Sequence, residues 1–395
     1  MAEKYTVTMS SSTYESLKLL LLLNRVSFAY QPETIKFCKS VRLVWRRKYQ
    51  ILSLGVIIAS VLLSIYGVTV NLQNELIHRI RLTKASGKII TFLDYGYLIF
   101  TTMIIPIILF ANFKHFSRYV ELISEVDMIL KYTSKSNSDT YVLYITLIST
   151  GFVFVSDICI WSSLLPKHQI VSYVLHQLPV YFTYYMQLLA IIDFHFLVKL
   201  LSSRVLFLSN SLQDFCKLKI STTSMVTKGV LVNTLQSPSN FQKLDMVHLY
   251  DLLYEASLSL NNFYGIALMF ALVGCLLHLL VTPYDLYLQM LNTRRHYSFI
   301  FSQTIWMLGH TFRLFLIVNP CERISNQLEN LSAILIRSLW RDHRFNINQL
   351  GVITMQMLHC PIKFSAAGLA KIDGGLITSV RIAMTLFTSL IFFSP

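Results

Sequence analysis

Seven long apolar segments constrain this chain more than any other feature, because each can cross a lipid bilayer as a helix. A membrane-spanning helix needs about 20 mainly apolar residues. These runs are continuously apolar, whereas the strands of a membrane β-barrel alternate apolar and polar residues. The sequence therefore predicts an all-α membrane protein with seven transmembrane helices, at Ile51–Val70, Thr91–Ala111, Tyr141–Leu164, Val171–Leu197, Ile266–Leu288, Ser298–Val318 and Leu376–Phe393.

The composition agrees with a surface that faces lipid over much of its area. Only 14% of the residues are charged, whereas a soluble domain has about 25%. The net charge of +14 comes from basic residues between the apolar segments, where lipid headgroups and membrane topology account for them. We therefore expect lipid, and no nucleic acid, as a partner. The six cysteines lack the paired spacing of a disulfide framework or zinc site, and we expect no metal or cofactor.

Basic residues close to the first span predict its orientation. Such charges favour the cytosolic side of a span, and four directly precede this one: Arg42, Arg46, Arg47 and Lys48. An N-terminus in the cytosol and seven spans place the C-terminus outside the cell. The run Leu19 to Leu23 is too short for a signal peptide, and we interpret it as part of an amphipathic cytosolic helix.

Two long connections on the cytosolic side divide the chain. Their apolar residues recur at helical spacing, so we expect the spans to continue into the cytosol as helices that pack there. The absence of an internal repeat disfavours an inverted-repeat transporter. The expected parts are a cytosolic segment 1–50, spans one to four in 51–199, a cytosolic helical connection 200–264, spans five and six in 265–318, cytosolic helices 319–375 and a last span in 376–395.

No sequence signature of an enzyme is present. The glycines form neither a phosphate-binding loop nor a dinucleotide-binding turn, and the H-E-x-x-H and G-x-S-x-G motifs are absent. We therefore expect no catalysis.

Polar and aromatic side chains gather on single faces of spans two to six, in their outer halves. Ionisable groups are costly in hydrocarbon, so these faces should point into the bundle. Aromatic walls with a few convergent polar groups predict a small-molecule pocket open to the outside; the alternative is an interfacial aromatic belt with polar groups that bond one another. The candidate residues are Asp94, Tyr95, Tyr97, Asp157, Trp161, Tyr173, His176, Gln177, Tyr181, His278, Asp285, Gln303 and Trp306.

Two further patterns lie deeper in the spans. Asp193 and Arg313 fall in inner halves, where a pair between them would be structural. The last span has a hydroxyl-rich stripe that either lines a water-filled pore shared between subunits or packs against another helix. Arg381 lies on that stripe near its inner end, where a ring of arginines at a narrow point would repel cations.

Two short motifs carry a family resemblance. The stretch Phe364-Ser365-Ala366-Ala367-Gly368-Leu369, with Ile372-Asp373 after it, leads into the last span. Asn261-Asn262-Phe263-Tyr264-Gly265 precedes the fifth. The chain resembles the insect gustatory receptors, in which F-S-A-x-G-L-F-x-I-D and N-x-x-[FY]-G occupy these places. The layout of spans and connections is similar throughout the chain.

The resemblance implies a ligand-gated, non-selective cation channel in the plasma membrane of a sensory neuron. It implies a homo- or heterotetramer, cytosolic helices that form an anchor domain, and a pore lined by the last span. The family's closing T-Y…Q-F signature is retained at Thr385 and Phe393, whereas Leu386 and Phe392 replace its tyrosine and glutamine. The implied pore and gate residues are Thr385, Thr388, Ser389, Phe392 and Phe393.

The ligand implied is a small-molecule tastant. A bitter plant compound is favoured over a sugar, because the candidate pocket is more aromatic than hydroxyl-binding. The alternatives are a G-protein-coupled receptor and a transporter. Against the first, the third span has no D-R-Y-like ending and the seventh has no N-P-x-x-Y.

Overall fold

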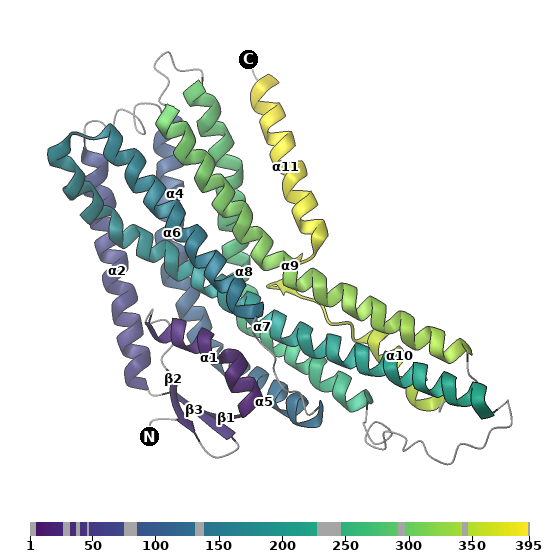
Figure 1. The fold of residues 1–395 in the computed structure, drawn as a ribbon. Coiled ribbons are helices and arrows are strands. Elements are labelled where there is room, and N and C mark those ends of the chain that lie inside the picture. The colour runs from purple at the N-terminus through teal and green to yellow at the C-terminus, as the bar shows by residue number, and fades with distance from the viewer. Residues whose placement is uncertain are drawn as a thin grey trace.

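The computed structural model is a bundle of long helices, shown in Figure 1. It describes residues 5–26, 32–36, 40–45, 47–74, 85–130, 138–226, 246–290, 297–341 and 347–393. Each of the seven apolar segments lies in a helix of its own: α2 (Arg47–Gln73), α4 (Ala85–Ala111), α6 (Ser138–Leu164), α7 (Lys167–Val226), α8 (Met246–Met290), α9 (Tyr297–Arg341) and α11 (Gly374–Phe393).

Four stretches of the described residues are long and apolar enough to cross a membrane by length and composition: Gln50–Gln73, Thr91–Ala111, Tyr141–Leu164 and Val247–Tyr284. They lie in α2, α4, α6 and α8. The apolar parts of α7 and α9 contain buried polar groups such as Asp193 and Arg313, and the apolar stretch found in α11, Gly374–Leu386, is short. The helical, multi-pass character of the chain is thus evident, and the count of seven spans remains a prediction.

Three helices extend well beyond the predicted spans. α7 continues to Val226 and α8 begins at Met246, so helix fills most of the connection expected between them; residues 227–245 lie outside the described residues. α9 continues to Arg341, and α10 (Ile347–His359) follows. Figure 1 shows α7, α8 and α9 running together toward the lower right, away from α2.

The N-terminal segment contains a small sheet that the sequence analysis did not predict. Strands β1 (Tyr5–Ser10), β2 (Pro32–Lys36) and β3 (Ser40–Trp45) form an antiparallel sheet in the order β1-β3-β2. Between β1 and β2 lies α1 (Ser11–Val26), which confirms the helix expected around the leucine run. The β1 strand packs against α5 (Phe113–Leu130), which follows α4 after a break at Asn112.

A fully buried ion pair joins the helices beneath this sheet. Nε and Nη2 of Arg204 on α7 donate to the two carboxylate oxygens of Asp127 on α5, at 2.9 and 3.0 Å. The hydroxyl of Thr13 on α1 donates to the same carboxylate at 2.6 Å. Arg204 is 1% exposed and Asp127 3%. Each charge is compensated by a bidentate partner, the arrangement in which a buried pair is tolerated.

The pair expected between Asp193 and Arg313 is not formed. Asp193 accepts a hydrogen bond from the side-chain amide of Asn24 on α1, at 3.0 Å. The guanidinium carbon of Arg313 lies 4.6 Å from the ring centre of Tyr184, in a cation–π contact. The partner of Asp193 thus comes from the N-terminal helix. The sequence pattern did not indicate where this helix lies in the fold.

The two motifs of the family resemblance contact each other in the fold. Strands β4 (Ser365–Ala366) and β5 (Ala370–Lys371) form a hairpin whose turn residues Ala367 and Gly368 both have positive φ, 53° and 74°. Positive φ at both central residues is what a type I′ turn requires, and glycine is favoured in such positions. The backbone N–H of Ser365 donates to Oδ1 of Asn261 on α8, at 3.0 Å. The hairpin therefore docks on α8 immediately before the last helix.

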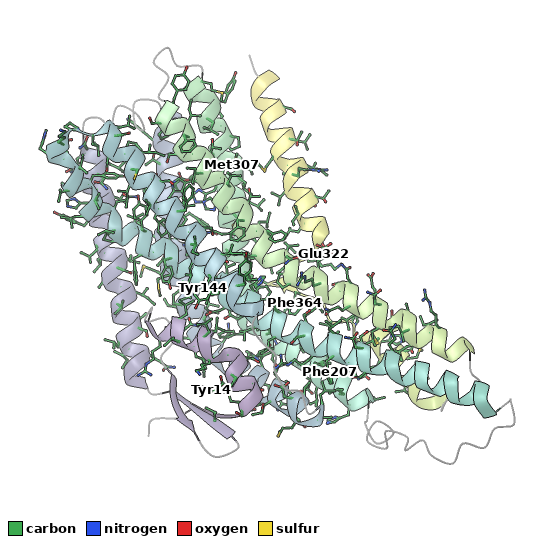
Figure 2. All side chains as sticks on the ribbon, viewed as in Figure 1. Tyr14, Tyr144, Phe207, Met307, Glu322 and Phe364 are labelled. Atoms are coloured by element: carbon green, nitrogen blue, oxygen red, sulfur yellow. The ribbon has the colours of Figure 1, made fainter. Side chains whose placement is uncertain are left out.

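α11 stands to one side of the bundle, and it contacts α8 and α9. Its first residue lies against Glu322 of α9, since a Cβ at Gly374 would be 2.8 Å from a carboxylate oxygen of that residue. Figure 2 shows Glu322 at the start of this helix, on the side of α9. A carboxylate at a helix N-terminus is favourable, and it links α9 to α11.

Asp373 caps the N-terminus of α11. Its carboxylate accepts hydrogen bonds from the backbone N–H groups of Gly375 and Leu376 and pairs with Nζ of Lys371 at 2.6 Å. The hydrogen bond from Lys371, together with those backbone bonds, lowers the pKa of Asp373.

We expect Asp373→Ala to destabilise the start of α11 by about 1 kcal/mol, the usual effect of removing an N-cap. Because the pKa is lowered in the folded chain, the stabilisation is complete above the ordinary pKa of aspartate, about 4, and is lost as the pH falls through the lower folded value. Thermal unfolding of the purified protein in detergent at several pH values measures this. Asp373→Asn, which can still accept a backbone bond, should retain most of the stability and lose the pH dependence.

Candidate functional site

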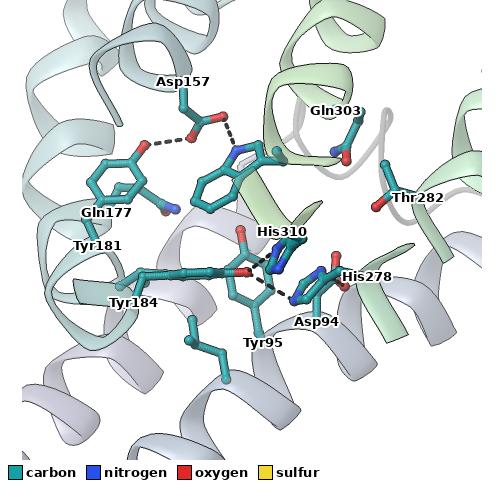
Figure 3. A pocket seen from close by; sticks show the side chains of 13 residues that line it. Asp94, Tyr95, Asp157, Gln177, Tyr181, Tyr184, His278, Thr282, Gln303 and His310 are labelled. Atoms are coloured by element: carbon teal, nitrogen blue, oxygen red, sulfur yellow. Dashed lines mark hydrogen bonds and ion pairs between the residues drawn. The ribbon is translucent and has the colours of Figure 1, made fainter. Parts of the chain in front are cut away.

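A cavity opens among α4, α6, α7, α8 and α9. Its lining combines carboxylates, amides, imidazoles and aromatic rings, which Figure 3 shows converging from several helices. Eight of the predicted ligand-binding residues line it: Asp94, Tyr95, Asp157, Gln177, Tyr181, His278, Gln303 and Trp306. Side chains from five separate helices thus meet, as the stripes on those helices led us to expect.

One wall of the cavity is organised around Asp157 of α6. Its carboxylate accepts hydrogen bonds from the Tyr181 hydroxyl at 2.6 Å, the Ser302 hydroxyl at 2.8 Å and the indole N–H of Trp306 at 3.2 Å. The donors come from α7 and α9, so this carboxylate joins three helices. Phe154 stacks on Tyr181 with ring centres 4.7 Å apart. Asp157 is thus supplied with protein donors and holds the aromatic wall in place.

The opposite wall is a chain of hydrogen bonds through two stacked histidines. His278 and His310 lie with ring centres 3.9 Å apart, and the Tyr184 hydroxyl lies 3.0 and 3.3 Å from their Nε2 atoms. Nδ1 of His278 is 3.2 Å from Asp94. If Nδ1 of His278 donates to Asp94, its Nε2 accepts from Tyr184, whose oxygen accepts from Nε2 of His310.

This assignment leaves Nδ1 of His310 as an acceptor. The atom is buried, and it has no hydrogen-bond partner among the described residues. A buried polar atom without a partner costs about 1–3 kcal/mol. A ligand or water that donates a hydrogen bond to this nitrogen would recover that cost.

The space inside the cavity is small with the side chains in the positions that the structure shows. About 50 Å³ is open to the centres of solvent molecules, which is enough for a few waters. The ring of Trp306 lies 4.8 Å from that of Tyr184, so the two aromatic walls nearly meet. A larger ligand would need these rings to separate.

Four other predicted residues lie elsewhere. Trp161 and Tyr173 form a separate cluster with Phe299. His176 is bonded to the backbone of Ser172 and lies against Tyr66. Tyr97 donates to the carbonyl of Phe270 at 2.6 Å and lines a smaller neighbouring cavity. The side chain of Asp285 lies outside the described residues. Their roles in binding remain predictions.

Three residues with polar side chains that line the cavity were missing from the sequence-based site: Tyr184, Thr282 and His310. Each lies on the same helical face as a residue that was included, since Thr282 follows His278 by four positions and His310 follows Trp306 by four. For Tyr184 and His310 the reason is depth, since the prediction was limited to the outer half of each span and the cavity reaches deeper. Thr282 lies between His278 and Asp285 and was omitted within that half. Helical spacing alone identifies them.

The predicted pore residues on α11 are partly described. Thr385 and Ser389 are exposed, and their hydroxyls donate to backbone carbonyls one turn earlier, those of Arg381 and Thr385, at 2.9 and 2.8 Å. The side chains of Thr388, Phe392 and Phe393 lie outside the described residues. The pore and gate remain a prediction.

The comparison with solved structures finds the same fold in an insect olfactory receptor. The receptor OR5 from Machilis hrabei superimposes with a TM-score of 0.63 at 11% sequence identity, covering 95% of this chain and 97% of that one. The structure of OR5 in complex with eugenol superimposes with a TM-score of 0.59 at 11% identity, covering 96% and 98%. At this identity the likeness concerns the fold.

A sequence relative and a family model both indicate a chemosensory receptor. The gustatory receptor for sugar taste 43a of Drosophila melanogaster is 30% identical over 129 residues, which is 32% of this chain and 30% of that receptor. The model of the 7tm chemosensory receptors matches residues 28–393. The chain is therefore a member of the seven-transmembrane chemosensory receptor family.

Proposed function

We propose that this protein is a gustatory receptor that acts as a ligand-gated, non-selective cation channel in the plasma membrane of a sensory neuron. The observation that carries the proposal is the cavity whose hydrogen-bonded walls, around Asp157 and around His278 and His310, meet inside a chemosensory receptor fold. The channel is a homo- or heterotetramer with α11 at its axis. The two alternatives of the sequence analysis, a G-protein-coupled receptor and a transporter, lack such support.

The contacts of α9 suggest how ligand binding reaches the pore. This helix carries Trp306 and His310 in the cavity and Glu322 against the start of α11. Separation of Trp306 from Tyr184 to admit a ligand would displace α9 relative to α7. A ligand opens the channel to the extent that it binds the displaced state more tightly.

The cavity favours an aromatic ligand with a hydrogen-bond donor, such as a bitter plant compound. Asp157 already accepts from three protein donors, and Asp94 is paired with His278, which leaves little capacity for the many hydroxyls of a sugar. Rings on both walls offer stacking surfaces. The eugenol bound by the Machilis receptor is an aromatic molecule. A sugar is the second candidate, because the Drosophila relative is a receptor for sugar taste.

A panel of bitter compounds and sugars tests this proposal in two steps. Calcium imaging of cells that express the chain, alone and with other gustatory receptors, identifies ligands. The purified protein is then reconstituted into vesicles without G proteins, and cation flux is recorded. Ligand-evoked flux supports a channel. A cellular response that disappears on reconstitution supports a coupled receptor, and ligand uptake without current supports a transporter.

We expect Phe392→Ala to raise the basal cation leak several-fold without ligand. A hydrophobic constriction closes a pore by excluding water, and removal of the ring widens and wets it. Whole-cell current at matched surface expression measures the leak. Leu386→Ala, one to two turns earlier on an exposed part of α11, is the control and should leave the basal current unchanged. Equal leak in wild type and Phe392→Ala would exclude Phe392 as the gate.

A further inference from the structure

A groove on the flank of the bundle, which we call the lateral groove, runs between α6 and α9 with α7 at its base. It consists of two cavities that share the side chain of Phe312. The space open to solvent centres is about 270 Å³ in one and about 220 Å³ in the other, against about 50 Å³ in the candidate ligand site. The lateral groove is thus the larger volume. Trp306 and His310 line both its first cavity and the candidate ligand site, and the proposed receptor function uses no other part of it.

The first cavity, which we call the apolar half of the groove, is lined mainly by apolar side chains, with His310 and Arg313 among the others, and it is open to the surroundings of the bundle. Phe152 of α6 and Leu308 of α9 line it and are 63% and 62% exposed. At Gly309 an added Cβ would meet one side-chain atom within 4 Å, Cγ2 of Val153 at 3.9 Å. An exposed apolar hollow of this kind on a membrane protein is complementary to a hydrocarbon chain.

The second cavity, the basic half, lies further along α9 toward the cytosolic extensions. Lys199 of α7 and Arg323 of α9 both line it, and none of the described residues that line either half is acidic. Glu322, next to Arg323, is turned toward α11. The two cationic groups therefore give this end of the groove a positive potential that a phosphate would complement.

A proline gives the basic half a fixed wall. Pro320 lies inside α9 and has no N–H to bond the carbonyl of Leu316, four residues earlier. Nδ1 of His195, on α7, lies 2.9 Å from that carbonyl and donates to it. The bond occupies the carbonyl that the proline leaves open and holds the imidazole against α9, where His195 lines the cavity.

We propose that the lateral groove binds an anionic phospholipid of the cytosolic leaflet, with its phosphate at Lys199 and Arg323 and an acyl chain beside Gly309. The distance fits: from Gly309 to Arg323 is fourteen residues of helix, about 21 Å at 1.5 Å per residue. Half of a bilayer that is about 40–45 Å thick with its headgroups is also about 21 Å. The choice of leaflet rests on the proposed cytosolic N-terminus, and anionic lipids are concentrated in that leaflet.

The test measures lipid retained by the full-length protein. The protein is purified from nanodiscs that contain phosphatidylcholine and phosphatidylserine in equal amounts, and bound lipids are counted by native mass spectrometry. We expect phosphatidylserine to be enriched. Removal of one basic group near a membrane surface weakens binding of an anionic lipid about fivefold, so Lys199→Gln and Arg323→Gln should each reduce the enrichment about fivefold, and Arg323→Lys should largely retain it.

Matched variants distinguish lipid binding in the groove from general effects of a lost charge or an added side chain. Arg337→Gln removes an exposed charge from the same helix outside the groove and should leave the enrichment unchanged. Gly309→Leu fills the apolar half, and it should displace the lipid. Gly151→Leu on α6, where an added Cβ meets nothing within 4 Å, makes the same change outside the lining and should not. Helical content by circular dichroism shows that each variant is folded.

Three outcomes would overturn the proposal. One is equal loss in Arg337→Gln and Arg323→Gln, which would indicate unspecific attraction. The second is displacement of the lipid by inorganic phosphate or glycerophosphoserine in the buffer, which would make this a site for a free anion. The third is unchanged enrichment in a folded Lys199→Gln/Arg323→Gln double variant. Since none of these readouts uses channel activity, failure of the lipid site leaves the proposed receptor function untouched.

Discussion

Removal of either partner of the buried Arg204–Asp127 pair is expected to abolish the folded protein at the cell surface. Loss of one partner leaves the other charge without its bidentate counter-ion in a site that is at most 3% exposed, which typically costs about 3–5 kcal/mol. That is a large share of the roughly 5–15 kcal/mol by which folded proteins are stable. Asp127→Ala also deprives the Thr13 hydroxyl of its acceptor, which loosens the N-terminal helix.

Surface biotinylation and thermal unfolding in detergent measure this effect. The double variant Asp127→Leu/Arg204→Met, in which both charges are absent, should recover much of the stability, because replacement of a buried pair by apolar residues is often neutral. The exposed pair of Arg118 and Glu255, at 2.9 Å, is the matched control. Its disruption by Arg118→Gln should change stability by less than about 1 kcal/mol. A stable Asp127→Ala variant would show that the pair is not a structural requirement.

Trp306→Ala is expected to shift the ligand response to at least about thirtyfold higher concentration. Buried tryptophans that dominate an interface typically contribute 2 kcal/mol or more, and about 2 kcal/mol corresponds to that factor. The substitution removes the ring beside Tyr184 and Phe154 and the donor to Asp157. Concentration–response curves in calcium imaging, at matched surface expression, measure the shift.

Two variants separate the contributions of this side chain. Trp306→Phe keeps an aromatic face and loses the N–H, so it should fall between wild type and Trp306→Ala. Phe301→Ala changes an aromatic residue of the same helix that is 59% exposed, and it should leave the response unchanged. Equal potency of Trp306→Ala and wild type would remove this cavity as the ligand site.

Asp157 is a less direct probe of ligand binding than its position suggested from sequence. An alanine there would leave three donors on α7 and α9 without an acceptor, and unsatisfied buried donors cost free energy of folding. A weaker response in Asp157→Ala would thus mix lost affinity with a disturbed wall. Asp157→Asn keeps the shape and one acceptor oxygen, and it isolates the charge.

The helices and much of the candidate site were predictable because both depend on periodicity. Long apolar runs indicate helices whatever their neighbours are, and residues three and four apart share a helix face. For that reason Gln303 and Trp306, three residues apart, were predicted to share a face, and the cavity indeed lies on that side of α9. Depth in the membrane was the weaker criterion, since it excluded Tyr184 and His310.

Contacts between distant segments were not predictable in this way. Thr13 and Asn24 of α1 donate hydrogen bonds to the buried carboxylates of Asp127 on α5 and Asp193 on α7. More than a hundred residues separate the partners in sequence, and nothing in the pattern around Thr13 and Asn24 indicates them. The strands β1, β2 and β3 are short, and their stability comes from pairing and from packing on α5. Such tertiary contacts decide where strands form more strongly than the local β-propensity of the sequence does.

The joint between α8 and the β4–β5 hairpin has a consequence for how chains of this kind diverge. A Cβ at Gly265 would lie 3.3 Å from the backbone nitrogen of Ala367, and Asn261 is bonded to Ser365 across the same contact. A methyl group at position 265 would therefore press on the turn at Ala367, which would have to move by a few tenths of an ångström. Substitutions at 261 or 265 should be inherited together with compensating changes in 365–368, although about a hundred residues separate the two stretches.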